Sequence, residues 1–326
     1  MAKTVTAKAH TNIALVKYWG KKDAALMLPQ NGSISLTLDH FYTQTSVTFD
    51  AQLTADQIYF NQQRLSASQA KRISRFLDIV RQQSGQSAYA KVQTENHVPT
   101  SAGLASSASG FAALAGAASR AAGLDLDATA LSRLARRGSG SATRSIFGGF
   151  VEWHAGHDDS SSYAEVLQDP VNWDIQMIAV VLKASKKPIS STEGMARVVA
   201  TSPYYPAWIT TAEADLNRMR HAIAAHDLPT VGQIAETNAM RMHALNLSAD
   251  PAFNYFTADT LTAIQAVTDL RSHGINCYYT LDAGPNVKII CAGQDTDVIM
   301  TRLQQHFDAN QLIVAKPGPG ITITEK

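Results

Sequence analysis

The sequence predicts an α+β fold, in which strands and helices are mixed without the regular strand–helix–strand order of a parallel sheet. Three observations lead to this prediction. Short segments of alternating or β-branched residues fill the first quarter of the chain, helical spacing of apolar residues dominates residues 207–272, and strand patterns return afterwards. The 326 residues, of which 45% are hydrophobic, are enough to form two domains. We expect these domains to be residues 1–185 and 186–326.

The predicted first domain begins with strands, separated by turn signals at Asn31-Gly32 and Asp39-His40. Apolar residues three and four apart then predict helices, and Gly123 stands where a glycine ends such a helix. A Gly/Ser-rich break at residues 138–144 follows the last of these helices. The expected strands are residues 4–9, 33–38, 43–49, 89–94, 149–153 and 174–183, and the expected helices are residues 68–83, 111–122 and 128–137.

The predicted second domain is mainly helical before it returns to strands. If Leu281 pairs with Val287 in a hairpin, Cys277 and Cys291 face each other, and we expect them to stay reduced with no catalytic role. The expected helices are residues 207–225, 231–247 and 259–272 and a segment ending near residue 306, and the expected strands are residues 276–281, 287–291 and 311–315.

Composition argues against several classes of partner. Lysine and arginine number 28 against 27 aspartates and glutamates, so no global charge attracts nucleic acid or a membrane surface. No apolar run reaches the roughly 18 residues that a membrane span needs, and the lysine-containing start lacks the apolar core of a signal peptide. Two cysteines allow at most one disulfide bond, which is too few to stabilise a chain of this size. We therefore expect a cytoplasmic protein with no nucleic-acid or membrane partner.

A loop of small residues, PTSAGLASSAS, begins at Pro99 and leads into a predicted helix. Backbone N–H groups that converge at a helix N-terminus bind phosphate well. The loop is neither a Walker A loop nor a GxGxxG motif, and its residue types alone also allow that it merely packs a helix against a sheet. The hydroxyls of Ser106 and Ser107 favour phosphate oxygens or Mg²⁺ as ligands.

Several cations occupy positions that suit anion binding. Lys17 and Lys21 bracket an aromatic segment, and Arg144 ends the Gly/Ser-rich break after Ser139, Gly140 and Ser141. Lys186 and Lys187 precede Ser190, Ser191 and Thr192 in the same way. Each cation taken singly also fits a solvated loop residue. Together, three separate anion cradles indicate a substrate with several negative groups.

Asp282 is the acidic residue that best fits a catalytic role. It ends an apolar strand and precedes a Gly-Pro turn. Turns recruit aspartate for backbone hydrogen bonds, so a structural role stays open. In a catalytic role, its carboxylate orients or deprotonates a hydroxyl group.

Four segments closely resemble the mevalonate diphosphate decarboxylases of the GHMP kinase superfamily, and the resemblance spans nearly the whole chain. They are residues 9–21, 99–108, 139–144 and 281–288. The resemblance implies a ribosomal-protein-S5-like N-terminal lobe and a ferredoxin-like C-terminal lobe. It further implies the Mg²⁺- and ATP-dependent decarboxylation of (R)-5-diphosphomevalonate to isopentenyl diphosphate, with release of ADP, phosphate and CO₂.

The resemblance also implies roles for individual residues. Asp282 faces the tertiary hydroxyl, Arg144 grips the carboxylate, and Lys17 lies near the carboxylate and the transferred phosphate. The substrate-binding residues implied are Tyr18, Trp19, Gly20, Lys21, Arg72, Ser139, Gly140, Ser141, Ala142, Thr143, Arg144, Ser191 and Thr192. The ATP-binding residues implied are Pro99, Ser101, Ala102, Gly103, Leu104, Ala105, Ser106, Ser107 and Lys187, with Ser106 or Ser107 as a Mg²⁺ ligand.

Other readings use the same fold. A small-molecule kinase that stops at phosphorylation, or a decarboxylase of the monophosphate, has a similar ATP loop and a similar acid. A catalytically silent nucleotide-binding sensor is the alternative from outside the enzymes. The family precedent and the apolar helices of the second domain also predict a homodimer.

Overall fold

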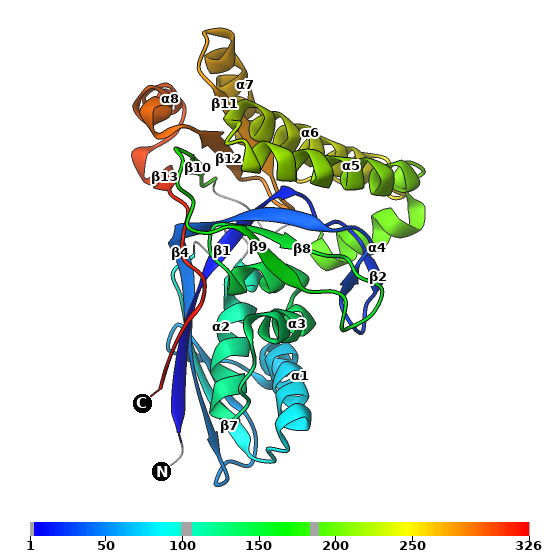
Figure 1. Cartoon of the computed structure of the whole chain (residues 1–326), viewed down its shortest axis with the longest axis vertical. Helices are drawn as coiled ribbons and strands as arrows, with labels where there is room; N and C mark the ends of the chain where they lie inside the picture. The colour runs from blue at the N-terminus through cyan, green and yellow to red at the C-terminus, as the bar shows by residue number, and fades with distance from the viewer. Residues whose placement is uncertain (1–2, 99–105, 183–188, 326) are drawn as a thin grey trace.

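Two β-sheets organise the chain in the computed structural model, which describes residues 3–98, 106–182 and 189–325. An eight-stranded sheet and a four-stranded antiparallel sheet form two lobes that lie one above the other (Figure 1). The prediction of an α+β fold is confirmed. The strands of the larger sheet are β1 (Thr4–Val16), β4 (Ser33–Asp50), β5 (Gln57–Phe60), β6 (Gln63–Arg64), β7 (Tyr89–Asn96), β8 (Phe150–Trp153), β9 (Ala164–Gln168) and β14 (Thr322–Glu325).

The long strands β1 and β4 pair antiparallel along most of their length. The predicted turn at Asp39 and His40 is wrong, because β4 runs through this point without reversing. The pairing instead shifts from His10 opposite Tyr42 to Asn12 opposite Thr37, so residues 38–41 form a bulge with Asp39 and His40 exposed. The turn-forming residues thus mark an irregularity in one strand.

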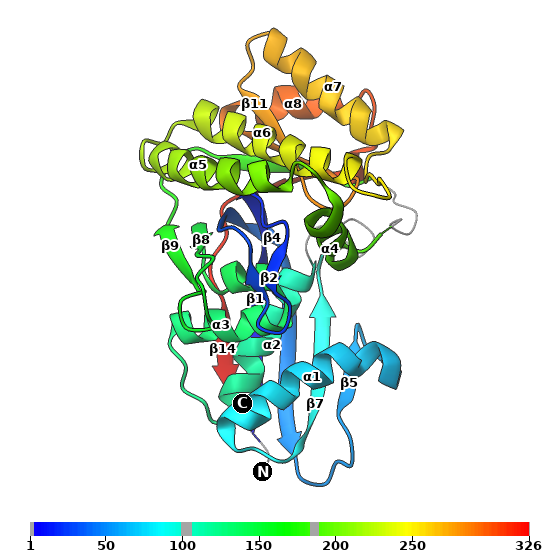
Figure 2. The same cartoon turned by 90° about the vertical axis from the view of Figure 1, so that its right-hand side faces the viewer.

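Helices α1 (Ala67–Ser84), α2 (Ser106–Ala121) and α3 (Ala128–Gly138) belong to the lobe of the larger sheet (Figures 1 and 2). Small residues let α2 pack closely on β1 and β14, since a Cβ on Gly116 would lie 2.6 Å from Ile321 just before β14, 3.1 Å from Ile323 in β14 and 3.3 Å from Ala7 in β1. The packing alternative for this segment is therefore correct for the body of α2. The first turn of α2, with Ser106 and Ser107, is still the candidate for phosphate binding.

The four-stranded sheet has the order β11-β12-β10-β13 and is covered on both faces. Helices α5 and α6 lie between this sheet and the larger one, whereas α7 and α8 pack on the opposite face (Figure 2). The elements of this lobe are β10 (Gln176–Val180), α5 (Tyr205–Ala224), α6 (Leu228–Leu247), α7 (Ala258–Ser272), β11 (Cys277–Leu281), β12 (Val287–Cys291), α8 (Thr296–Leu303) and β13 (Leu312–Ala315).

Three short elements complete the fold near the junction of the lobes. Helix α4 (Ser191–Thr201) and the two-stranded sheet of β2 (Lys21–Asp23) and β3 (Leu28–Pro29) lie on one side, and a 3₁₀ helix covers Gly140–Ile146. Strand β14 runs back to pair with β1, so both chain ends lie at the foot of the first lobe (Figure 1). In the described part of the chain, no helix has the length and apolar character to cross a membrane.

Cys277 and Cys291 face each other across β11 and β12, as predicted. Both are buried and unbonded. Burial raises the pKa of the Cys277 thiol to about 11 and that of the Cys291 thiol to about 12. Neither thiol is therefore a ready nucleophile, since reactivity requires the thiolate.

Candidate active site

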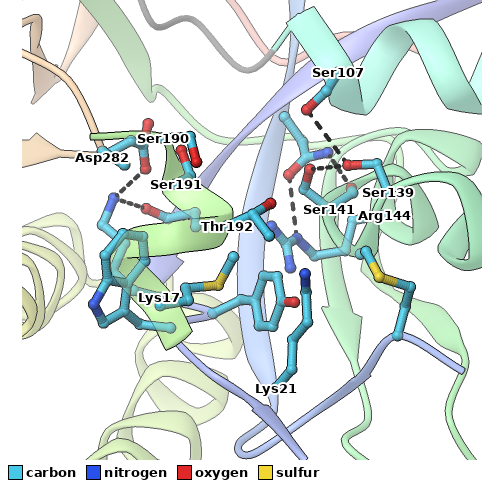
Figure 3. A pocket seen from close by; sticks show the side chains of 18 of the residues that line it. Lys17, Lys21, Ser107, Ser139, Ser141, Arg144, Ser190, Ser191, Thr192 and Asp282 are labelled. Atoms are coloured by element: carbon cyan, nitrogen blue, oxygen red, sulfur yellow. Dashed lines mark hydrogen bonds and ion pairs between the residues drawn. The ribbon is translucent and has the colours of Figure 1, made fainter. Parts of the chain in front are cut away.

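A cavity of about 410 Å³ collects most of the predicted site residues. Its wall is built from the end of β1, the first turns of α2 and α4, the 3₁₀ helix and the turn after β11 (Figure 3). The predicted residues that line it are Lys17, Tyr18, Trp19, Lys21, Arg72, Ser106, Ser107, Ser139, Gly140, Ser141, Arg144, Ser191, Thr192 and Asp282.

Asp282 is held by two lysines from different parts of the chain. Its Oδ1 accepts a hydrogen bond of 2.8 Å from Nζ of Lys17, and its Oδ2 accepts one of 3.0 Å from Nζ of Lys288. Burial favours the protonated carboxyl, but the charges of the two lysines outweigh it and hold the pKa of Asp282 well below its usual range. Asp282 is therefore a carboxylate at neutral pH.

Lys17 follows the last residue of β1 and is 2% exposed. Its backbone N–H donates to Oδ1 of Asn238 on α6, and its Nζ also donates to the carbonyl of Ala14 at 2.6 Å. Burial lowers the pKa of Lys17 to about 8, although the neighbouring Asp282 acts in the opposite direction. A buried ammonium with an unusually acidic proton thus faces the cavity.

Arg144 lies on the 3₁₀ helix and is 2% exposed. Its Nε donates to Asn12 Oδ1 at 3.1 Å and to Ser35 Oγ at 3.0 Å, and its Nη1 donates to Ser33 Oγ. Burial lowers its pKa to about 10. Within the described residues no carboxylate forms an ion pair with it and Nη2 makes no hydrogen bond, so neutral partners hold a cation that has room for an anionic ligand.

Hydroxyl groups gather near Arg144 in the same cavity (Figure 3). Ser139 donates to Ser107 at 3.4 Å and lies 3.4 Å from Ser141, oxygen to oxygen. A side chain at Gly140 would not fit, because its Cβ would lie 2.8 Å from the Trp153 ring and 2.9 Å from the Tyr18 ring. The glycine therefore lets the 3₁₀ helix pack closely against these two rings at the wall of the cavity.

Tyr18 packs edge-on against Trp153, with 4.8 Å between ring centroids. Burial raises its pKa, which keeps the phenol protonated. Its hydroxyl is buried and has no hydrogen-bond partner among the residues that the structure describes. A buried, unpartnered donor on a cavity wall is a natural contact for a ligand oxygen.

Lys21 and Arg72 bring two further cations to the cavity. Arg72 extends from α1 and donates from Nη2 to the carbonyl of Gly138 at 2.8 Å. Burial and the charge of Arg72 both lower the pKa of Lys21. In the described ranges neither cation forms an ion pair, so an anionic ligand in the cavity would relieve their mutual repulsion.

The first turn of α4 adds a helix N-terminus. Ser190 caps this helix, because its Oγ accepts the N–H of Glu193 at 3.2 Å. Ser191 and Thr192 follow in the first turn and line the cavity (Figure 3). Their hydroxyls and the free N–H groups of the turn favour a negatively charged group.

Some expected site residues do not reach the cavity. Gly20 lies beside it with φ +121°, and a Cβ there would collide with the Tyr205 hydroxyl, which donates to the Trp19 carbonyl at 2.8 Å. Ala142 and Thr143 are buried in the 3₁₀ helix and do not line the wall. Seven predicted ATP-binding residues lie outside the part of the chain that the structure describes: Pro99, Ser101, Ala102, Gly103, Leu104, Ala105 and Lys187.

Sequence reasoning missed two polar residues of this site. Asn12 braces Arg144 and also donates to the Ser141 carbonyl at 3.0 Å and to Ser145 Oγ at 2.7 Å. Lys288 donates a hydrogen bond to Asp282 and thereby holds its carboxylate in place. A signal for Lys288 exists, since it is a lysine inside the otherwise apolar strand β12. The apolar wall residues Met27, Met195 and Met242 carried no signal of their own.

The hydroxyl oxygens at the N-terminus of α2 are suitable ligands for a Mg²⁺ ion that is bound together with phosphate. The described residues contain no cluster of three or more His, Cys, Asp or Glu side chains that could hold a metal ion. Ser106 and Ser107 instead offer hydroxyl oxygens, the hard ligands that Mg²⁺ prefers, at the N-terminus of α2. Such a site needs ligand phosphates to supply the remaining oxygens.

Comparison with known proteins agrees with this geometry. A family model described as a diphosphomevalonate decarboxylase-like N-terminal domain matches residues 9–164, and one described as a mevalonate 5-diphosphate decarboxylase C-terminal domain matches residues 177–317. Human diphosphomevalonate decarboxylase is 37% identical over 308 residues, covering 87% of this chain and 76% of the relative. Diphosphomevalonate decarboxylase mvd1 of Aspergillus fumigatus is 36% identical, covering 90% and 78%.

Solved structures show the same similarity over the full length. The mevalonate diphosphate decarboxylase of Enterococcus faecalis superposes with a TM-score of 0.95 at 46% identity, covering 100% of both chains. A structure described as MDDEF in complex with MVAPP, AMPPCP and magnesium gives a TM-score of 0.96 at 47% identity, again covering 100% of both chains.

Proposed function

The chain belongs to the mevalonate diphosphate decarboxylase family, and from that premise we propose how its cavity carries out the family's reaction. The reaction converts mevalonate 5-diphosphate and ATP into isopentenyl diphosphate, ADP, phosphate and CO₂, with Mg²⁺ as cofactor. A saturated 3-hydroxy acid has no electron sink, so direct loss of CO₂ would leave an unstabilised carbanion. Phosphorylating the 3-hydroxyl makes it a leaving group and allows the carboxylate electrons to form the new double bond.

The observation that carries the proposal is a group of cations without acidic partners in the described chain. Lys21, Arg72 and Arg144 line one cavity and none of them forms an ion pair there. A substrate with a diphosphate at one end and a carboxylate at the other supplies the missing anions. The diphosphate contacts Lys21, Arg72 and the hydroxyls of Tyr18, Ser139, Ser141, Ser191 and Thr192, and Trp19 and Gly140 shape this end of the cavity.

Arg144 binds the substrate carboxylate. Its Nε and Nη1 are occupied by Asn12, Ser33 and Ser35, which fixes the plane of the guanidinium. Nη2 has no partner in the described residues and is available to the carboxylate. A rigid, planar donor holds the carboxylate beside the carbon that loses the phosphate.

Asp282 acts on the tertiary hydroxyl. Its carboxylate orients the hydroxyl, or accepts its proton, for attack on the γ-phosphorus of ATP. When the phosphate leaves, the same negative charge stabilises the positive charge that develops at the tertiary carbon. Lys17, 2.8 Å from Asp282, stabilises the transferred phosphate and the carboxylate on the same side of the cavity.

The nucleotide lies at the N-terminus of α2. We expect its phosphates to contact residues 99–105, the hydroxyls of Ser106 and Ser107, and the ammonium of Lys187. Mg²⁺, when bound with the phosphates at Ser106 or Ser107, neutralises the negative charge on their oxygens. Phosphoryl transfer depends mainly on positioning and charge neutralisation, which matches a cavity rich in cations and hydroxyls.

We further propose a cytoplasmic homodimer with lobes at residues 1–185 and 186–326. The buried, unbonded pair of Cys277 and Cys291 supports a reducing compartment. Two strands depart from this division, because β10 precedes residue 186 but lies in the smaller sheet, and β14 follows it but lies in the larger sheet.

Incubating the enzyme with ATP and Mg²⁺ tests the substrate assignment. Mevalonate 5-diphosphate and mevalonate 5-phosphate are compared as substrates, and products are identified by mass. We expect isopentenyl diphosphate and CO₂ from the diphosphate. Faster CO₂ release from the monophosphate, or a stable phosphorylated product without CO₂, would reject the proposal.

A further inference from the structure

Lys288 is a buried lysine in an apolar strand. It follows Val287 and precedes Ile289 in β12, both buried, and is itself only 1% exposed. Side chains alternate between the two faces of a sheet, so Lys288 shares a face with Ile290, which packs in the core between the lobes. Lysine is almost never fully buried unless its charge is paired. The partner of this charge therefore explains why a lysine is tolerated here.

That partner is Asp282. Nζ of Lys288 donates to Asp282 Oδ2 at 3.0 Å and to the carbonyl of Asn286 at 3.4 Å, and it has no other hydrogen-bond partner in the described chain. Asp282 and Lys17 line the cavity, but Lys288 does not. A ligand in the cavity therefore does not touch Lys288, and Lys288 can act on it only through Asp282.

The two lysines hold different oxygens of one carboxylate. Lys17 binds Oδ1 and Lys288 binds Oδ2, so both the position and the plane of the carboxylate are determined. Lys17 faces the cavity and is open to anionic groups of a ligand. Lys288 does not line the cavity, so a ligand there does not compete for its ammonium, and its contact with Asp282 persists when Lys17 turns to the ligand.

We propose that Lys288 is a positioning residue for the decarboxylation, an inference that rests on the proposed role of Asp282. Its ammonium orients the carboxylate of Asp282 and keeps it ionised while Lys17 binds the substrate. Among residues 3–98, 106–182 and 189–325, the other charged or titratable groups facing Asp282 are Arg144 on the 3₁₀ helix and His243 on α6. Burial and the nearby Lys17 lower the pKa of His243 to about 3, so this imidazole is neutral and does not replace the ammonium.

Lys288→Met tests the proposal because it removes the charge and keeps a similar length. We expect kcat to fall at least about 10-fold while KM for mevalonate diphosphate changes less than about 3-fold, since Lys288 does not touch the substrate. The acid limb of the kcat profile moves to higher pH, because Asp282 retains only one ammonium contact. Lys288→Arg, which keeps the charge, recovers part of kcat. Ile290→Val is the control on the same face of β12, with kcat within about 2-fold of the wild type.

A double variant separates positioning from general damage. In an Asp282→Asn background, Lys288→Met should lower kcat by less than about 2-fold, because the two residues act as one unit. If Lys288→Met does not fold, Lys288→Gln carries the same expectations, since its amide supplies no charge. Wild-type kcat in the charge-removing variant, or an equal loss in the Asp282→Asn background, would overturn the proposal. Failure of the wild-type enzyme to release CO₂ would instead reject the proposed function.

Discussion

Lys17 and Asp282 are 265 positions apart in sequence, yet their side chains form an ion pair of 2.8 Å across the junction of the two lobes. Lys17 belongs to the end of β1 in the larger sheet, and Asp282 follows β11 in the smaller one. The pair therefore places the carboxylate that we propose as catalytic, in one lobe, against the proposed anion-binding groups of the other.

Asp282→Asn should abolish most of the turnover. The amide keeps the shape but loses the negative charge, so kcat should fall by about 10³ or more with little change in KM. Steady-state kinetics with mevalonate diphosphate measures both constants. Asp297→Asn on the exposed side of α8 serves as the control and should behave as wild type. Turnover near the wild-type level in Asp282→Asn would contradict the assigned role.

Arg144→Lys should be poorly tolerated although it preserves the charge. A lysine cannot reproduce the fork that contacts Asn12, Ser33 and Ser35, so the substrate carboxylate loses its fixed donor. We expect kcat/KM to fall by about 10- to 100-fold, the equivalent of one or two charge-assisted hydrogen bonds. The same exchange at Arg302, which forms a surface ion pair with Asp269, should have no effect. Kinetics unchanged by Arg144→Lys would remove this residue from the site.

The alkaline limb of the pH profile should report Lys17. Burial lowers its pKa to about 8, Asp282 opposes this shift, and Lys288 and Arg144 add to it. The charged form is the one that binds anions, so kcat/KM should fall as the pH rises through about 8. Lys17→Arg should move this limb to higher pH, because a guanidinium stays protonated. An unchanged midpoint in that variant would assign the limb to another group.

Arg72→Met should weaken binding of the diphosphate. The Arg72 guanidinium lines the cavity and has no ion pair in the described chain, so it is available to phosphate oxygens. The substitution removes this cation. We expect KM for mevalonate diphosphate to rise by about 10-fold, the value of one charge-assisted hydrogen bond, with a smaller change in kcat. Lys71→Met, next to it on α1 and outside the cavity wall, is the matched control. Equal KM values for the two variants would show that Arg72 does not bind substrate.

Gly20→Ala should destabilise the fold through a steric clash. The added Cβ would meet the Tyr205 hydroxyl at a backbone φ of +121°. Gly274→Ala is the control, since Gly274 also has a positive φ of +89° but no atom within 4 Å of the added Cβ. The control should lose about 1 kcal/mol of unfolding free energy, and Gly20→Ala a further 1–3 kcal/mol, roughly, from overpacking. Urea denaturation measures both, and equal losses would exclude the clash as the cause.

Much of the fold follows from local patterns in the sequence. The helices α1, α3, α5, α6 and α7 lie within a few residues of their predicted ranges, because periodic apolar residues report the face that each helix buries. The bulge at Asp39 and His40 looked like a turn, since the same residue types serve both. Strand β14 was missed, because its pairing with β1 depends on contacts between opposite ends of the chain.

The candidate site was also predicted only in part. Residues in unusual local sequence, such as Lys17, Arg144 and Asp282, stood out and line one cavity. Asn12 and Lys288 act by supporting other residues, and such a role becomes visible only when the partner's position is known. Gly20 and Thr143 belong to the right segments but do not line the cavity, because Gly20 packs against Tyr205 and Thr143 is buried within the 3₁₀ helix.

The stoichiometry of nucleotide use tests the central claim most directly. Purified enzyme is given mevalonate 5-diphosphate, ATP and Mg²⁺, and ADP, CO₂ and isopentenyl diphosphate are counted in the same reaction. If phosphorylation of the alcohol drives the loss of the carboxylate, the three products appear in equal amounts, and none forms without ATP. Isopentenyl diphosphate produced without consumption of nucleotide would contradict this account.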